Sequence, residues 1–298
     1  MSYRLGINLG FAINRYPEPE VWSRIVREEL GLGYVQFVAD LLNPFLPEAY
    51  VKEQLTRIKQ STEEYGIRTE SIFTSAFTRV NHMMSPDEEA RKIWIDWFKR
   101  FLEEGHALGA KSGGSHFGIL TFDSLEPPKR REFLIEECIK GWQEISRYAA
   151  DLGYEELIFE PMSVPREMAC TVEETKALME RVNADSAIPL LVNLDVGHAP
   201  HPDERDPYMW IKALAKDSPV IHLQQTELNR SNHWPFTKEY NEKGIIEAGK
   251  VLELVRESGR DDVLFAFEIA HREHWDTDGK VIEDLKESVK YWRRYIEE

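Results

Sequence analysis

Short apolar runs alternate with longer amphipathic stretches along the whole chain. A short apolar run is typical of a strand buried on both faces, and each stretch between runs has the apolar spacing of a helix packed on one side. The runs predict eight strands, at residues 4–9, 34–39, 68–73, 111–117, 156–161, 188–195, 220–225 and 263–269. Each run is followed by a helical pattern, which indicates eight repeated βα units.

Turn and capping residues mark the ends of the predicted helices. Glycines come shortly before five of the predicted strands, where a left-handed residue commonly ends a helix: Gly33, Gly66, Gly109, Gly153 and Gly259. Thr171 and Glu174 predict a capping box at the start of another helix. Ser85 predicts a helix cap, with Pro86 as the first helical residue.

The repeat predicts an α/β protein of the (β/α)8 barrel class. Eight units in 298 residues give about 37 residues each, which matches a barrel of roughly 250 residues with some long loops. A doubly wound sheet is the alternative, but no Gly-x-Gly-x-x-Gly follows the first strand. Without a linker of low complexity, residues 1–298 are predicted to form one domain. The non-helical stretch 226–243 after the seventh strand is long enough to predict a functional loop.

Composition narrows the range of partners and locations. The chain has 37 Lys plus Arg against 53 Asp plus Glu, a formal net charge of −16, which disfavours a nucleic-acid partner. With 42% hydrophobic residues it can bury a large core. Cys138 and Cys170 are expected to be free thiols. The absence of a signal-like stretch or an 18-residue apolar run leads us to expect a cytoplasmic protein without a membrane partner.

Four polar side chains follow apolar runs at the ends of predicted strands five to eight: Glu160, Asp195, His222 and Glu268. The C-terminal ends of parallel barrel strands meet at one mouth, where the active site forms. Three carboxylates buried there without a cation would repel one another and resist ionisation. Three oxygen donors and one imidazole suit one divalent metal, Mn²⁺, Mg²⁺ or Co²⁺. The alternative is four separate polar residues, each satisfied by its own neighbours.

Such a site is suited to proton transfer next to a ketose carbonyl. A metal polarises the carbonyl, so that one glutamate, Glu160 or Glu268, can remove the neighbouring proton and leave a cis-enediolate. Return of a proton by the other glutamate from the opposite face inverts the carbon. Return to the other carbon would interconvert an aldose and a ketose. The residues alone support both outcomes.

Further polar residues are candidates for substrate binding. His198 follows Asp195 by three residues, and His116 ends the fourth predicted strand. The loops after the fifth and seventh strands carry candidates for holding a phosphate: Arg166, Arg230, His233 and Lys238. The alternative for His198 is a partner that supports Asp195, and for His116 it is a core histidine bonded to the backbone. Solvent exposure is the alternative for the loop residues.

The order of these residues resembles that of the xylose isomerase-like TIM barrels, and most closely the sugar and sugar-phosphate isomerases and epimerases, including the ketose 3-epimerases. The resemblance rests on Glu160, Asp195-Val-Gly-His198, His222 and Glu268. It implies that the two glutamates, Asp195 and His222 bind one divalent metal, and that His198 contacts a substrate oxygen. It also implies that Glu167 contacts the reacting end of the sugar, and that the protein is a homo-oligomer.

Longer segments are similar to the tetrulose-phosphate (erythrulose-phosphate) epimerases. These segments are Glu160-Pro-Met-Ser-Val-Pro-Arg-Glu167, Gly114-Ser-His116-Phe-Gly118, His222-Leu-Gln224-Gln-Thr226 and His233-Trp-Pro-Phe-Thr237. The likeness implies a small ketose or ketose-phosphate substrate, contacted by His116, Gln224 and His233 among others. The ketose epimerases carry an arginine six residues after the strand-seven histidine. Here that position is Leu228, and the nearest arginine is Arg230.

Three alternatives to an epimerase stay open at this point. An aldose–ketose isomerase would use the same residues. A DNA-repair endonuclease of the same barrel superfamily would need more metal ligands and a basic groove, and the charge of −16 disfavours it. The third alternative is a barrel that binds a sugar without converting it.

Overall fold

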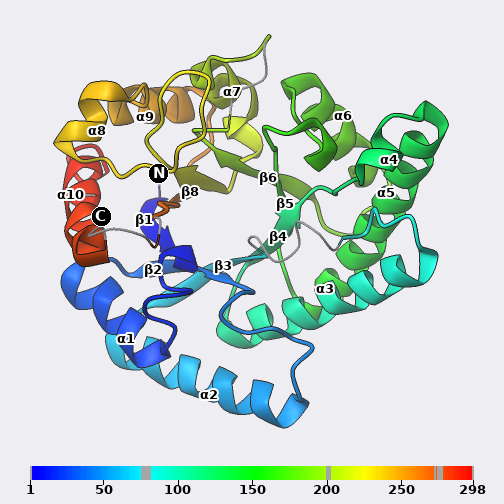
Figure 1. The fold of residues 1–298 in the computed structure, drawn as a ribbon. Helices are drawn as coiled ribbons and strands as arrows, with labels where there is room; N and C mark the ends of the chain where they lie inside the picture. Colours follow the sequence, from blue (N-terminus) through cyan, green and yellow to red (C-terminus); the bar gives the residue numbers. More distant parts are fainter. Residues whose placement is uncertain (1, 75–81, 199–202, 272, 274–277, 297–298) are drawn as a thin grey trace. The chain divides into compact units, whose positions relative to one another are not determined.

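Eight parallel strands close into a barrel in sequence order, β1 to β8, with helices between them. The structure is a computed structural model that describes residues 2–74, 82–198, 203–271, 273 and 278–296. The strands are β1 (Ser2–Asn8), β2 (Tyr34–Val38), β3 (Arg68–Phe73), β4 (Ser112–His116), β5 (Glu156–Glu160), β6 (Leu190–Asp195), β7 (Val220–Leu223) and β8 (Asp262–Phe267) (Figure 1). The predicted (β/α)8 barrel is confirmed.

The helices follow the strands along the chain. The α-helices are α1 (Pro19–Arg24), α2 (Glu48–Tyr65), α3 (Glu88–Leu108), α4 (Phe122–Leu125), α5 (Pro128–Leu152), α6 (Val172–Asn183), α7 (Pro207–Leu214), α8 (Lys238–Lys243), α9 (Ala248–Glu257) and α10 (Val281–Trp292). Shorter helical turns are η1 (Leu9–Phe11), η2 (Ile25–Glu29), η4 (Pro165–Glu167), η5 (Ala215–Asp217) and η6 (Asp278–Lys280). The predicted non-helical stretch 226–243 is wrong at its end, because Thr237 caps α8 by accepting from the Tyr240 N–H.

The chain divides into two compact units. The first comprises residues 1–36, 56–70 and 193–298, and the second comprises residues 37–55 and 71–192. In the first unit, β1 pairs with β2 and β8, and β7 pairs with β8. In the second unit, β4 pairs with β3 and β5. The expectation that residues 1–298 form one domain stays a prediction.

Each unit has its own aromatic core. In the first, Trp292 of α10 packs edge-on against Phe236, with ring centroids 5.2 Å apart, and also contacts Phe265 of β8. In the second, α3 and α5 lie side by side, and Phe98 of α3 contacts Trp142 of α5 (Figure 1). Burial of such large apolar rings is the main stabilising contribution to folding.

Most of the predicted helix ends are confirmed. Gly66, Gly109, Gly153 and Gly259 have positive φ, but the fifth left-handed glycine is Gly31 rather than Gly33. The preceding helical segment is a π-helix with its C-cap at Leu30, so the chain turns two residues earlier than predicted. Left-handed backbone at position 31 favours glycine, since a Cβ is strained there.

Two predicted N-caps differ in detail. Thr171 accepts from the Glu174 N–H as predicted, but the Glu174 carboxylate accepts from the Cys170 N–H rather than closing a box with Thr171. The cap of α3 is Asp87, which accepts from the Ala90 N–H, and the prediction of Ser85 is wrong. Asp87 directly precedes the first residue of α3, and it therefore caps this helix in place of Ser85.

Both cysteines are buried free thiols, as predicted. Among the helices described, none combines the length and the apolar character needed to cross a membrane.

Glu104 of α3 is a buried carboxylic acid outside the predicted site. Its side chain is 3% exposed, and within the described residues neither carboxyl oxygen has a hydrogen-bond partner. Burial raises the pKa of Glu104 to about 8, and repulsion by Glu103 acts in the same direction. The carboxyl is therefore protonated in the folded protein at pH values where it is ionised in the unfolded chain.

A Glu104→Gln substitution is expected to stabilise the protein more at pH 8 than at pH 5. Because the folded pKa lies above the unfolded value, wild-type stability falls as pH rises from about 4.5 to about 8. The gain in free energy of unfolding from the substitution should therefore grow by about 2 kcal/mol or more between the two pH values. Denaturant unfolding at both pH values measures it.

The control is Glu64→Gln on the exposed side of α2, which should change the free energy of unfolding equally at pH 5 and pH 8. Equal effects of Glu104→Gln at the two pH values would contradict the assignment.

Candidate metal centre

The ends of β6, β7 and β8 bring three of the predicted metal ligands together. Asp195 ends β6, His222 lies in β7, and Glu268 follows directly after β8. One ligand atom from each lies within 4.8 Å of the others. The closest approach joins His222 Nδ1 to Glu268 Oε2, at 3.2 Å. The pairing of Asp195 with His222 in the β6–β7 register fixes two of these side chains on neighbouring strands.

Asp195 is fully buried and held by neutral donors. Its Oδ1 accepts from the Gly197 N–H at 2.6 Å, and both carboxylate oxygens accept from Gln224 Nε2, at 3.0 and 3.1 Å. These bonds orient the carboxylate without neutralising its charge. A cation nearby would therefore still be favourable.

The His222 ring lies in a buried network of amides. His222 Nε2 is 2.6 Å from Gln36 Oε1 of β2. Asn193 Nδ2 of β6 lies 3.1 Å from Nδ1 and 3.3 Å from Nε2, nearly equidistant from the two ring nitrogens. Neither Gln36 nor Asn193 separates His222 Nδ1 from Glu268 Oε2, which lies 3.2 Å away.

Glu268 Oε2 faces two imidazole nitrogens, His222 Nδ1 at 3.2 Å and His233 Nδ1 at 3.6 Å. Burial raises the pKa of this carboxyl, but positive charge on the imidazoles of His222, His233 and His198 lowers the pKa well below its usual range when these rings are protonated. Within the described residues, Glu268 Oε2 is buried without a hydrogen-bond partner. A buried anionic oxygen 3.2 Å from an imidazole nitrogen is suited to sharing a cation with it. Asp195, His222 and Glu268 therefore fit a divalent metal.

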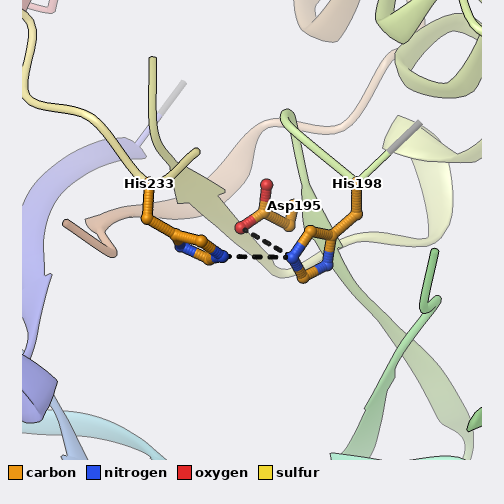
Figure 2. Close-up of side chains that lie close together, drawn as sticks. All are labelled: Asp195, His198 and His233. Atoms are coloured by element: carbon orange, nitrogen blue, oxygen red, sulfur yellow. Dashed lines mark hydrogen bonds and ion pairs between the residues drawn. The ribbon is translucent and has the colours of Figure 1, made fainter. Parts of the chain in front are cut away.

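A second group of three ligand-type residues shares Asp195. One ligand atom each of Asp195, His198 and His233 lies within 4.8 Å of the others, and Figure 2 shows the two imidazoles facing one another. His233 Nδ1 is 3.1 Å from the Glu268 backbone oxygen, which only accepts, so Nδ1 carries the hydrogen. His233 Nε2 is then an acceptor, with Gln224 Nε2 and Ser231 Oγ at 3.3 Å and His198 Nε2 at 3.4 Å. Both ring nitrogens of His233 therefore have partners within the protein.

His233 reaches its place through a strained loop. Its backbone has φ 51°, which is uncommon for a residue with a side chain. The loop is closed by the antiparallel bridge of Gln225 with Trp234, and the His233 N–H donates to Gln224 Oε1 at 2.6 Å. Strain held by surrounding bonds is frequent at functional sites. Gln224 thus connects Asp195 with His233, and its role in substrate binding stays a prediction.

Three other predicted residues belong to the second compact unit. Glu160 ends β5 and His116 ends β4, and the two are partners in the β4–β5 register. Both are buried. Glu167, on the turn η4, is also buried and forms an ion pair with Arg166 at 3.2 Å. The metal and substrate roles of these residues stay predictions.

Arg230 lies on the exposed part of the loop after β7. It lines a small cavity with Arg205, Gly197 and Thr226. The lining also includes Glu227, and Gly197 of this cavity directly precedes His198 in the chain.

Three buried amides near His222 were not predicted from the sequence. Asn8, Gln36 and Asn193 are all buried and belong to β1, β2 and β6. The signal for Gln36 and Asn193 is a polar residue within an otherwise apolar strand, whereas the prediction considered residues at strand ends. Gln36 and Asn193 contact His222, and Asn8 contacts Gln36.

Relatives of known name cover the whole chain. D-erythrulose 1-phosphate 3-epimerase of Brucella abortus (strain 2308) is 32% identical over 302 residues, covering 100% of this chain and 97% of that protein. A crystal structure from Rhodospirillum rubrum ATCC 11170, provisionally assigned as a xylose isomerase, is 26% identical with TM-score 0.88 and covers 98% of this chain and 99% of that one.

More distant structures share the fold. D-psicose 3-epimerase with D-tagatose from Clostridium cellulolyticum H10 has TM-score 0.75 at 15% identity, covering 98% of this chain and 99% of that chain. The family model described as xylose isomerase-like TIM barrel matches residues 26–295. The chain therefore belongs to the xylose isomerase-like TIM barrel family.

Proposed function

We propose that this protein is a divalent-metal-dependent sugar epimerase that acts on a small ketose phosphate of the erythrulose-phosphate type, at the carbon next to the carbonyl. The observation that carries the proposal is the meeting of two carboxylates with an imidazole: ligand atoms of Asp195, His222 and Glu268 lie within 4.8 Å of one another, and Glu268 Oε2 is 3.2 Å from His222 Nδ1. The B. abortus relative named D-erythrulose 1-phosphate 3-epimerase supports the substrate class. A homo-oligomeric state and a cytoplasmic location remain expectations.

Glu160 is proposed as the fourth ligand of the same metal. It ends β5, and the residue before it, Phe159, pairs with Val192 of β6. Asp195 ends β6 three residues further on. Because active sites of such barrels form at the C-terminal ends of the strands, the place of Glu160 at the end of β5 supports its role as a ligand. Mn²⁺, Mg²⁺ and Co²⁺ all accept this ligand set.

The two glutamates carry out the proton transfers in the proposed reaction. A bound divalent ion supplies Lewis-acid polarisation of the ketose carbonyl, which acidifies the adjacent C–H. Glu268 accepts that proton and leaves an enediolate. Glu160 enters protonated and donates its proton to the same carbon from the opposite face. The carbon is inverted, and proton exchange with water restores both glutamates.

His198 is proposed to bind the substrate oxygen that gains charge. Its Nε2 lies 3.4 Å from His233 Nε2 and 4.0 Å from Asp195 Oδ2 (Figure 2). A donor that is already oriented stabilises developing negative charge without reorganisation. Glu167, His116, His233 and Gln224 remain candidate substrate contacts.

The position of the phosphate favours epimerisation over aldose–ketose isomerisation. In a ketulose 1-phosphate the C1 oxygen is esterified, so moving the proton from C1 cannot form an aldose. Such a substrate can still be inverted at C3, because the phosphate at C1 does not involve the C3–H bond. The residues do not distinguish the two reactions for an unphosphorylated ketose. The charge of −16 continues to disfavour the DNA-repair alternative.

Glu268→Gln and Glu160→Gln are each expected to lower epimerisation and exchange by about 10²–10⁴-fold. The assay is NMR in D₂O with tetruloses, pentuloses and hexuloses, with and without phosphate, after addition of Mn²⁺, Mg²⁺ or Co²⁺. Wild type should incorporate deuterium at C3 of a tetrulose phosphate. EDTA should abolish this exchange, and the metal should restore it.

The control is Glu253→Gln on the exposed side of α9, which should keep wild-type exchange. Full exchange in both site variants would contradict the proposed roles. Tight binding without product across the panel would support a binding protein instead.

Arg230 and Arg205 are proposed to hold the phosphate. Both line one cavity with Gly197, whose backbone N–H donates a hydrogen bond to Asp195 Oδ1. Guanidinium groups bind phosphate by charge-assisted hydrogen bonds. The two arginines would take the role of the arginine that other ketose epimerases carry at the position of Leu228.

Arg230→Ala is expected to lower kcat/KM about 10-fold or more for the phosphorylated ketose and to change it little for the free ketose, because only the phosphate contact is removed. Steady-state kinetics with the two substrates measures the difference. Lys238→Ala is the control, since Lys238 lines a separate cavity beside Phe236 and Tyr291. Equal losses with both substrates would contradict a phosphate role.

A further inference from the structure

Asn8 is fixed by the backbone and can present only its amide nitrogen to the barrel interior. Its Oδ1 accepts from the Gly10 N–H at 2.8 Å, at the start of the turn η1. A Cβ at position 10 would lie 2.9 Å from that oxygen, so glycine is the residue that permits this approach. With Oδ1 committed to a backbone donor, Asn8 Nδ2 points away from the turn as a donor.

This donor sets the orientation of Gln36. Asn8 Nδ2 lies 2.7 Å from Gln36 Oε1, so the oxygen of the Gln36 amide must face Asn8. The Gln36 nitrogen then faces Asn193, whose Oδ1 accepts across 3.4 Å. Both ends of the Gln36 amide are therefore assigned by their partners, and the reversed amide would set two donors against each other.

The same oxygen sets the hydrogen of His222. Gln36 Oε1 lies 2.6 Å from His222 Nε2, and an amide oxygen only accepts, so Nε2 must carry the hydrogen. In a neutral imidazole Nδ1 then keeps its lone pair. Asn193 Nδ2 only donates, and it lies nearer to Nδ1, at 3.1 Å, than to Nε2, at 3.3 Å, which is compatible with a hydrogen on Nε2.

We infer that Gln36 is a positioning residue, which, through the hydrogen-bonded series Gly10–Asn8–Gln36–His222, holds His222 in the Nε2–H form and leaves Nδ1 ready to bind the metal. Nδ1 is the nitrogen that lies 3.2 Å from Glu268 Oε2. The opposite tautomer would place an N–H where the metal ligand is needed. The ring nitrogen that bonds a metal is commonly set by the hydrogen bond of the other nitrogen. The inference rests on the proposed metal-dependent function.

The first test is the tautomer of His222 in metal-free protein labelled with ¹⁵N-histidine, at pH 8. Long-range ¹H–¹⁵N correlations should show the hydrogen on Nε2 in the wild type. Asn8→Asp keeps the acceptor for Gly10 but cannot donate to Gln36, so the Gln36 amide should turn and His222 should change to the Nδ1–H form. A wild-type Nδ1–H form, or an unchanged tautomer in Asn8→Asp, would overturn the inference.

The second test is Mn²⁺ affinity by calorimetry. Gln36→Leu removes the acceptor and should weaken binding by about 10–100-fold. Gln36→Glu keeps an acceptor for both Asn8 and His222, and should retain the Nε2–H form and most of the affinity. Wild-type affinity in a folded Gln36→Leu protein would overturn the inference. The tautomer is measured without metal or substrate, so a protein with the expected tautomer but no epimerase activity would contradict the proposed function alone.

Discussion

Hydrogen-bond acceptors are concentrated at the ends of β6, β7 and β8, and the ability of the site to bind a metal depends on this concentration. Two carboxylates and one imidazole lone pair meet within 4.8 Å, and one carboxylate oxygen has no donor among the described residues. Such a group is costly to bury unless a cation joins it. The surrounding amides orient these acceptors without neutralising them, so the arrangement is prepared for a metal rather than stabilised without one.

The proposed reaction follows from the same group of residues. A carboxylate can accept a proton, and a cation bound beside it would make the adjacent C–H of a ketose acidic enough to give one up. The histidine pair adjoins this centre through Asp195. Arg205 and Arg230, in the segments after β6 and β7, place positive charge on an otherwise acidic protein.

The sequence predicted the strands well because parallel barrel strands are buried on both faces and read as continuous apolar runs. Asp195, His222 and Glu268 were found because each follows such a run. Gln36 and Asn8 were not predicted. The role of a buried amide depends on its hydrogen-bond partners, and these are distant in the sequence. The Gly33 prediction failed for a local reason, as a π-helix ends the segment early and shifts the left-handed turn to Gly31.

Anomalous diffraction from crystals of the Mn²⁺-bound protein would locate the metal. We expect one strong peak at the manganese edge, about 2.0–2.2 Å from His222 Nδ1 and from oxygens of Asp195, Glu268 and Glu160. A peak bound by His198 and His233 in its place, or no peak at β6–β8 in protein that is saturated with Mn²⁺, would contradict this expectation.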